Sequence, residues 1–557
     1  MSMQKTEKQK IKYTLFTGKQ LLWLILPIVI EQIFSTSLGM IDSIMISNIP
    51  EIGKTASNAV GNVDYMNNLI IQLFSAFATG GAIITAQALG AKDNETAKNS
   101  AKQMLVFVLI MSLGIGAACL ALNWPLLKLF YGEVTPEVFG YQRIYFYVTA
   151  ASFPFIGLFN ACAALLRVQR KSLFTMISAA ISCVLNVGMN ALFLFVAKMG
   201  VLGAGLATLI CRAIPAIFML ALLSNKKNTV SVRIFEKFRF NGTLLKRILK
   251  IAIPSGIESC LFQLGKLMTN TFVNVGCYAN GEFAKPVIDP LTGLQKVDEN
   301  GALMFSNIQA NGNTAANQIN NIASVVGGGV GTSCLTVIGQ AVGAGDPDQV
   351  KYYMKKMFFL SYILNGICCG IILALVPWIV QMYGFDVEAL DVAKRCLYFC
   401  LCFQFVTYPL SFTTPGILKA TSDVKYVMWS AIASMFIMRV GLAFLLTTDK
   451  IPGLPRLGAF GYWIGMCSDW VLRSVLFFTR LLTGKWKKAS GLIKEPEAVA
   501  VAAGAGDTPG ESISVTVGEC SGKELTNEPT VETTAEEDEE IVQTDENDGD
   551  DMANKEI

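Results

Sequence analysis

The chain has 557 residues, of which 52% are hydrophobic and 16% charged, and its mean hydropathy is +0.47. Soluble globular proteins carry about 25% charged residues, so the composition excludes that class and favours a polytopic membrane protein. The sequence contains no histidine, which excludes zinc sites and proton relays built on that residue.

The net charge of +3 conceals two opposed regions. Residues 489–557 hold 19 acidic and 3 basic side chains, a net charge of −16, whereas the first 488 residues carry a net charge of +19. The acidic region is rich in Thr, Gly and Asn and lacks the apolar content that a folded core requires. We therefore predict a disordered acidic tail attached to a basic membrane body.

Twelve apolar segments, each long enough to cross a bilayer, predict an all-α protein with twelve transmembrane helices. The first six lie near residues 20–46, 63–89, 104–123, 141–166, 173–196 and 203–223. The second six lie near residues 248–275, 315–342, 357–383, 396–418, 427–447 and 460–482.

An eight-residue stretch occurs twice, as Ala86–Asp93 and as Gly339–Asp346, at an offset of 253 residues. Upstream, Pro27 and Glu31 are repeated as Pro254 and Glu258 at an offset of 227, which indicates an insertion of about 26 residues in the second copy. Internal duplication of this length is typical of transporters built from two homologous six-helix halves.

Each copy of the repeated stretch ends an apolar run with a glycine, Gly90 or Gly343. Neither copy follows a strand or carries the Gly-Lys-Ser/Thr of a phosphate-binding loop. We predict instead that both glycines end helices in the left-handed conformation and open tight cytoplasmic turns.

Basic residues cluster in alternate loops, which by the positive-inside rule places both termini in the cytoplasm of a multi-pass plasma-membrane protein. The predicted regions are a cytoplasmic N-terminus 1–19, an N-lobe 20–224 with helices 1–6, a cytoplasmic linker 225–247, a C-lobe 248–483 with helices 7–12 and an extracellular insertion 277–313, and a cytoplasmic tail 484–557. The insertion is expected to be poorly ordered or to form a small extracellular cap.

The first helix carries two acids, Glu31 and Asp42. Their eleven-residue spacing is close to three helical turns, so both project from one face. Pro27 frees a backbone carbonyl in the same helix, and an acid beside such a proline suits an ion-gated helix. We therefore assign Pro27 and Glu31 to gating; the alternative for Asp42 is a hydrated position at the outer helix end.

Further polar residues occur on the fifth, sixth and seventh helices. Asn186 and Asn190 share a face of the fifth helix, and Thr208 on the sixth adds another oxygen of the kind that hard cations prefer. Polar packing between helices explains the same pattern, and composition alone favours it.

The seventh helix holds a possible C-lobe cavity set, formed by Glu258, Gln263 and Lys266. Glu258 and Lys266 could be bridged or could pair with other helices, because a charge in hydrocarbon normally faces a partner or a cavity. On the last helix Asp469 and Arg473 are four residues apart, which predicts a structural ion pair.

These features resemble the multidrug and toxic compound extrusion (MATE) transporters over about residues 15 to 483. The resemblance rests on AQALGAKD and GQAVGAGD closing the second and eighth helices, GMIDSIMI in the first and LGAGLAT opening the sixth. It implies a V-shaped pair of lobes around a central cavity. It also implies export of organic, typically cationic and amphipathic solutes in exchange for H+ or Na+.

The resemblance also implies a coupling site in the N-lobe. Asp42, Asn186 and Thr208 match its pattern, but the family's Asp on the fifth helix is here Asn190. An amide cannot take up a proton near neutral pH, so coupling must rely on Asp42 or on an acid elsewhere. A second branch of the family places a Glu on the seventh helix where this chain has Phe262 and Gln263, so Glu258 is only a candidate.

The sequence therefore predicts a monomeric, cofactor-free antiporter, coupled to H+ or to Na+ at Asp42, that binds no nucleic acid. The nearest alternative is a flippase for a lipid-linked precursor, whose cavity would be strongly basic to hold pyrophosphate. An enzyme is disfavoured because no nucleophile and base cluster together. A receptor or scaffold that uses the acidic tail is a third reading, which predicts that deleting residues 489–557 abolishes function.

Overall fold

The computed structural model describes residues 15–49, 52–132, 134–232, 240–273, 284–286, 305–382, 385–447 and 457–492. All of these described residues belong to one compact unit, Met1–Glu497. The described residues are helical apart from short connections and two three-residue strands, which confirms the all-α class. The acidic tail beyond Leu492 and most of the insertion 277–313 lie outside the described residues.

The first half of the unit begins where Thr17 and Gln20 form a reciprocal capping box. Its elements are α1 (Gly18–Ser47), α2 (Gly53–Gly90), α3 (Asn94–Ala121), α4 (Asn123–Tyr131), α5 (Pro136–Ala151), α6 (Phe153–Val168), α7 (Ser172–Asn190), the π-helical η1 (Ala191–Val196) and α8 (Gly200–Leu223).

The second half repeats this order with more interruptions. Its elements are α9 (Gly242–Thr271), β1 (Ala284–Pro286), β2 (Phe305–Asn307), α10 (Ile308–Gly343), α11 (Pro347–Gln381), α12 (Val387–Tyr408), η3 (Pro409–Thr413), α13 (Thr414–Ala420), α14 (Val424–Ser434), η4 (Met435–Leu442), α15 (Ala443–Thr447), α16 (Ala459–Leu482) and α17 (Trp486–Ala489). Asn307 caps α10 by accepting a hydrogen bond from the Ala310 N–H at 2.9 Å.

Among the described residues, 10 helices are long and apolar enough to cross a membrane, and α5 with α6 forms an eleventh span with a 45° bend. Helix α16 is the twelfth predicted segment. It is less apolar than the other spans because it carries Asp469, Arg473 and Arg480. Of these three residues, Asp469 and Arg473 are buried. Large apolar side chains such as Trp23, Phe359 and Trp429 are more than 60% exposed, as expected for lipid-facing surfaces.

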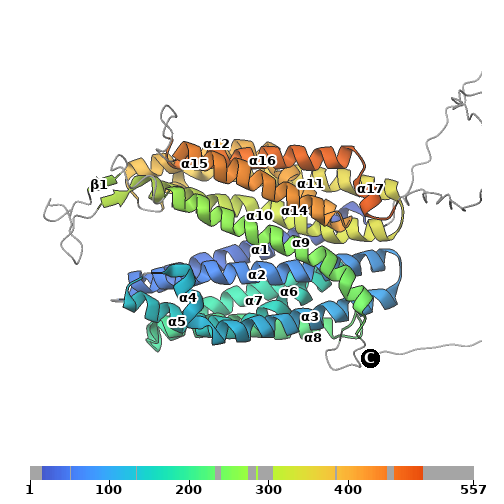
Figure 1. The fold of residues 1–557 in the computed structure, drawn as a ribbon, viewed down its shortest axis with the longest axis horizontal. Helices are drawn as coiled ribbons and strands as arrows, with labels where there is room; N and C mark the ends of the chain where they lie inside the picture. Colours follow the sequence, from blue (N-terminus) through green and yellow to red (C-terminus); the bar gives the residue numbers. More distant parts are fainter. Residues whose placement is uncertain are drawn as a thin grey trace, which may run out of the picture. The chain divides into compact units, whose positions relative to one another are not determined.

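The insertion contributes one described structure, an antiparallel pairing of β1 with β2 in which Lys285 opposes Ser306. The pair lies directly before α10, at the end of the helices opposite α17 (Figure 1). It is a small departure from the purely helical expectation.

Four helices join the two halves: α9 packs along α2, and α1 packs along α10 (Figure 1). Glycines permit the close approach. A Cβ at Gly80 of α2 would lie 2.8 Å from the Ala252 Cβ of α9, and a Cβ at Gly329 of α10 would lie 2.8 Å from a methyl group of Val29 of α1. The first helix of each half is therefore anchored against the second helix of the other half.

The repeated eight-residue stretches pack against each other at the ends of α2 and α10. A Cβ at Gly90 would collide with the carbonyl of Gln340, and a Cβ at Gly343 would collide with the carbonyl of Gln87. The left-handed residues are instead Lys92 and Gly345, with φ of 60° and 81°. Our assignment of Gly90 and Gly343 to that conformation is thus wrong, because helix contact requires these glycines and the turn comes two residues later.

Hydrogen bonds repeat the same symmetry across the junction. The Gln87 side-chain amide donates to the Ala420 carbonyl at 2.9 Å, and that of Gln340 donates to the Val168 carbonyl at 2.8 Å. The Arg170 guanidinium also donates to the Gln340 side-chain oxygen at 2.9 Å. Each half therefore binds the other through an equivalent glutamine.

The turn after α2 lies outside the spans and is fixed by Asp93, whose carboxylate accepts from the Thr96 N–H at 2.9 Å. Hydrogen bonds from the side chain and backbone of Thr96 lower the pKa of this carboxyl. Asp93 therefore stays ionised at neutral pH and caps the start of α3.

We expect Gly343→Ala to destabilise the protein by about 1–3 kcal/mol, the usual cost of overpacking a tight contact. Thermal unfolding in detergent, followed by intrinsic fluorescence, measures the effect. Gly370→Ala on α11 is the matched control, since a Cβ there meets nothing within 4 Å. Equal melting temperatures for the two variants would contradict the packing role of Gly343.

Candidate coupling site and central cavity

A cavity of about 650 Å³ lies between the two halves. It is lined by residues of α1, α2 and α4 from the first half and of α9, α10, α12, η3, η4 and α16 from the second. Amide side chains predominate among its polar groups: Gln32, Asn68, Gln72, Gln263, Asn270, Asn317, Gln318, Asn320 and Asn321. Aromatic rings provide much of its apolar surface: Tyr65, Phe130, Tyr131, Phe262, Tyr408, Phe412, Tyr462 and Trp470.

The cavity occupies the end of the helices opposite the Gly90–Gly343 contact. On α9 it is lined by residues 262–270, near the end of that helix, and on α10 by residues 314–324, near its beginning. The junction formed by the repeated stretches therefore separates the cavity from the opposite end of the helices.

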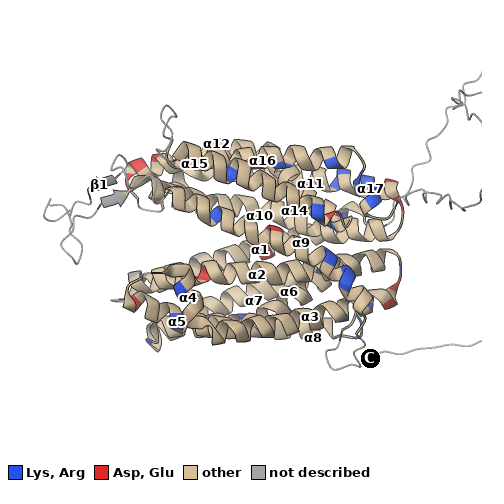
Figure 2. Ribbon diagram, viewed as in Figure 1, with Lys and Arg blue, Asp and Glu red and all other residues tan. Residues whose placement is uncertain are grey.

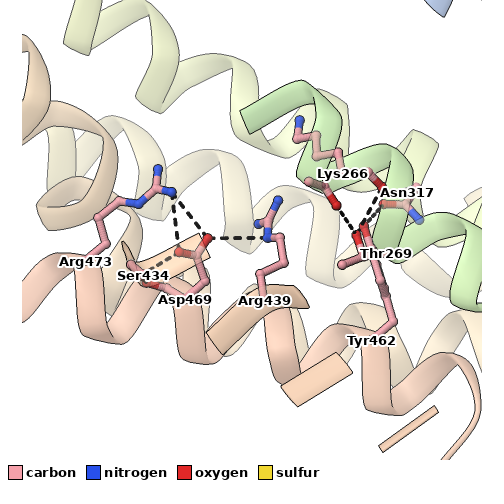
Figure 3. A network of polar contacts seen from close by, with 9 residues as sticks. Lys266, Thr269, Asn317, Ser434, Arg439, Tyr462, Asp469 and Arg473 are labelled. Atoms are coloured by element: carbon pink, nitrogen blue, oxygen red, sulfur yellow. Dashed lines mark hydrogen bonds and ion pairs between the residues drawn. The ribbon is translucent and has the colours of Figure 1, made fainter. Parts of the chain in front are cut away.

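A buried charge cluster supports the cavity wall in the second half. The Asp469 carboxylate is fully buried and lies 3.4 Å from both Arg439 and Arg473, and the Ser434 hydroxyl donates to it at 2.7 Å. Figure 3 shows Asp469 between the two guanidinium groups. The predicted Asp469–Arg473 pair is present, and Arg439, in the π-helical η4, joins it.

Among the described residues, Lys266 and Arg439 are the charged residues that line the cavity. Both lie over the ring of Phe262, with the Lys266 Nζ and the Arg439 Cζ each 5.1 Å from its centroid. The Arg473 Cζ lies 5.0 Å from the same centroid. Three cations therefore surround one aromatic ring, an arrangement favoured by the negative face of that ring.

The seventh-helix candidates separate in the structure. Gln263 and Lys266 line the cavity, but Glu258 does not and instead pairs with Lys419 at 2.8 Å. Glu258 lies about two turns nearer the start of α9 than Lys266 does, and its partner there is Lys419 of α13. Of the two arrangements left open for Glu258, the structure therefore has the one in which it pairs with another helix.

The N-lobe candidates meet around Asp42, which is buried rather than hydrated. The Asn190 amide donates to its carboxylate at 2.5 Å and to the Asn186 side-chain oxygen at 3.3 Å. The Asn190 oxygen has no hydrogen-bond partner. The Thr208 hydroxyl donates its hydrogen bond to the Ala204 carbonyl rather than to Asp42, and it lies beside Tyr145.

Sequence analysis missed two members of this cluster, Asp64 and Tyr145, and predicted for Arg212 only that it satisfies backbone carbonyls or acids near a helix end. The Tyr145 hydroxyl donates to the Asp64 carboxylate at 3.3 Å. Asp64 interacts electrostatically with both Asp42 and Arg212. The available signal was an acid near the start of the second apolar segment, but only tertiary packing, of α2 against α1 and against α5, brings it to Asp42 and Tyr145.

Glu31 and Asp42 both contact α7, as the three-turn spacing predicted. Glu31 pairs with Arg167, and the Thr175 hydroxyl donates to its carboxylate at 2.6 Å. Pro27 cannot bond the carbonyl of Trp23, which accepts a hydrogen bond from the Ser172 hydroxyl at 3.3 Å instead. The polar groups of α1 near Pro27 are thus held by α6 and α7.

The model of the MatE family matches residues 27–192 and 309–445. The two matched segments cover more than half of the chain, and one lies in each half of the fold. This chain belongs to the MatE family. The membership makes it a transporter of the multidrug and toxic compound extrusion class, as the sequence resemblance predicted.

Curated relatives of this MatE chain are similar over most of their length. A probable multidrug resistance protein NorM of Thermotoga maritima is 24% identical over 86% of this chain and 95% of the relative. The probable multidrug resistance protein YoeA of Bacillus subtilis is 23% identical over 78% of this chain and 88% of the relative.

Solved structures confirm the fold. An outward-facing multidrug resistance MATE family transporter of the MOP superfamily superposes with a TM-score of 0.71 at 20% identity, covering 84% of this chain and 96% of that one. A MOP superfamily transporter from Pyrococcus furiosus, described as having a binding pocket of reverse polarity, gives a TM-score of 0.70 at 21% identity, with coverages of 84% and 96%.

We expect Asp469→Asn to destabilise the MatE fold by about 3–5 kcal/mol, because removing one partner leaves buried guanidinium groups without compensation. The melting temperature of the purified protein measures this loss. Asp348→Asn is the control, since its ion pair with Lys351 is solvent-exposed, and it should leave the melting temperature unchanged. A similar melting temperature for both variants would show that Asp469 does not hold the cluster together.

Proposed function

We propose that this MatE protein exports small organic solutes across the plasma membrane by antiport with H+ or Na+. The observation that carries the proposal is the coexistence of two separate sites. One is a cavity of about 650 Å³ between the halves, and the other is the buried cluster around Asp42. The names of the curated relatives, which include probable multidrug resistance proteins, support the same function.

The distribution of charge supports a cavity that opens outward. Figure 2 shows Lys and Arg positions gathered at the end of the helices where α17 lies. By the positive-inside rule that end is cytoplasmic, so both termini are cytoplasmic and the cavity faces the exterior. The Gly90–Gly343 junction then lies on the cytoplasmic side of the solute site.

In this mechanism the cluster around Asp42 binds the coupling ion. Asn190 offers no carboxylate, but Asp64 lies within electrostatic reach of Asp42 and supplies the second acid. A carboxylate held in a partly dry environment exchanges H+ or Na+ readily, because water no longer compensates its charge. The unpaired Asn190 oxygen is a further ligand for a hard cation.

Ion binding would act on the solute cavity through α1. That helix carries Asp42 on the ion cluster and, one to three turns away, Gln32 and Thr36 on the cavity wall. Pro27 and Glu31 lie further toward the cytoplasmic end, where α6 and α7 hold them. A change of hydrogen bonds at Asp42 therefore shifts a helix that lines both sites.

A flippase for a lipid-linked precursor remains the second candidate function. The observation that favours it is the pair of cations, Lys266 and Arg439, in the cavity lining, since pyrophosphate recognition requires basic groups.

We expect Asp42→Asn to abolish gradient-driven export in proteoliposomes. The assay would load 5-carboxyfluorescein or rhodamine 123 and apply a pH gradient and a Na+ gradient separately; the gradient that drives wild-type export identifies the coupling ion. The amide removes the exchangeable charge, so the expected loss is complete. Asp391→Asn, which changes a surface pair with Lys394, is the control.

Export by Asp42→Asn at the wild-type rate would overturn the coupling role of Asp42. We expect Asp64→Asn to weaken coupling as well, because it removes the second carboxylate of the cluster.

A further inference from the structure

We propose that the central cavity binds organic anions with an aromatic body, rather than the cationic solutes that the family resemblance led us to expect. The inference rests on the proposed function, in that it takes this cavity to be the solute site. It follows from the charge of the lining, from unpaired donors on Arg439 and from the arrangement of aromatic rings.

The lining carries positive charge alone. Lys266 and Arg439 face the cavity, and no Asp or Glu of the described residues lines it. Glu258, the acid on the same helix as Lys266, does not neutralise the lysine charge because it forms an ion pair with Lys419. Asp469 is shared by Arg439 and Arg473. At this end of the cavity three basic side chains (Lys266, Arg439 and Arg473) therefore stand against a single acidic one, Asp469.

Arg439 retains hydrogen-bonding capacity that the protein does not use. Its side chain is 1% exposed, yet neither its Nε nor its Nη1 has a hydrogen-bond partner. The Nε lies 3.4 Å from Asp469, an ion pair without hydrogen-bond geometry. The Nη1 has no such neighbour, a buried donor without a partner is unfavourable, and an oxygen of a carboxylate, sulfonate or phosphate would satisfy it with a charge-assisted bond.

Aromatic rings lie directly beside the cations. Phe262, over which Lys266 and Arg439 lie, packs against Phe412 with their centroids 6.3 Å apart. Phe412 stacks on Tyr408 at 4.1 Å and meets Trp470 edge-on at 6.0 Å. A flat ring on the ligand gains further contact area from such a surface, so the favoured ligand combines an acidic group with an aromatic system.

The same geometry disfavours cations. A positively charged solute would approach Lys266 and Arg439 without a carboxylate in the lining to offset them, and like charges in a site of low dielectric repel strongly. The abundant amides of the lining accept or donate hydrogen bonds with equal ease, so they do not reverse this preference.

Equilibrium binding tests the proposal without requiring transport. The purified full-length protein in detergent would be titrated into 5-carboxyfluorescein or rhodamine 123, two xanthene dyes of opposite charge, and fluorescence anisotropy would be recorded. We expect the anion to bind at least about tenfold more tightly than the cation, since one charge-assisted contact contributes at least this factor. Equal or tighter binding of rhodamine 123 would overturn the proposal.

Variants of Lys266 provide the second arm. Lys266→Gln should weaken 5-carboxyfluorescein binding about tenfold by removing one charge-assisted contact, whereas Lys266→Arg should preserve it. Lys394→Gln, at an exposed surface pair, should bind like the wild type. Unchanged anion binding by Lys266→Gln would show that the dye does not occupy this cavity, and would also overturn the proposal.

Competition distinguishes a soluble acid from a lipid anion. Naphthalene-2-carboxylate and a polyprenyl diphosphate would each be added to the bound dye, and we expect the soluble acid to displace it. Displacement by the diphosphate alone would show that the cavity binds a lipid headgroup, and would overturn the proposal that its ligand is a soluble aromatic acid.

The outcomes also separate this inference from the proposed antiport. Gradient-driven export of rhodamine 123 that depends on Asp42, without binding of the anion, would overturn the inference and leave the antiporter intact. Anion binding that depends on Lys266, without export of either dye under either gradient, would support the inference and count against the antiporter.

Discussion

The close approach of α2 and α10 is the constraint on which the rest of the structure depends. Backbone carbonyls of each helix occupy the space where the other helix would carry a Cβ, so Gly90 and Gly343 tolerate no side chain. Gln87 and Gln340 then reach across to carbonyls of the opposite half. Because the helices touch at one end and diverge toward the other, the same contact that joins the halves leaves room for a solute between them.

Much of the fold could be predicted because its signals are local. Apolar segments, the repeated stretch and the spacing of Glu31 and Asp42 are properties of continuous sequence. The partners of the buried charges are not: Glu258 meets Lys419, and Asp64 reaches Asp42 from another helix. Such pairings depend on tertiary packing, which a single sequence does not reveal. The left-handed turn was misplaced because Gly343 and Gly345 both suit it by composition, and in the first copy the residue that adopts it is Lys92, which composition does not indicate.

The two halves share a plan but differ in electrostatic sign. The repeated stretch recurs after 253 residues, and by that offset Asn186 corresponds to Arg439. The Pro27–Glu31 segment recurs after 227 residues, and by that offset Asp42 corresponds to Thr269. A carboxylate in one half thus has no counterpart in the other, and an amide beside that carboxylate corresponds to a guanidinium. Duplicated scaffolds permit this divergence because each copy keeps its packing residues while the polar residues on equivalent helices change.

The cationic lining also has a consequence for the energy source of transport. Exchange of one cationic solute for one proton moves no net charge, so the membrane voltage does not drive it. Exchange of a monovalent anion for one inward cation moves the equivalent of two positive charges inward. Each of these charges gains about 2.3 kcal/mol per 100 mV of inside-negative potential. With Lys266 and Arg439 in its cavity, the protein would be an electrogenic exporter able to concentrate its solute outside even when the chemical gradient of the coupling ion is small.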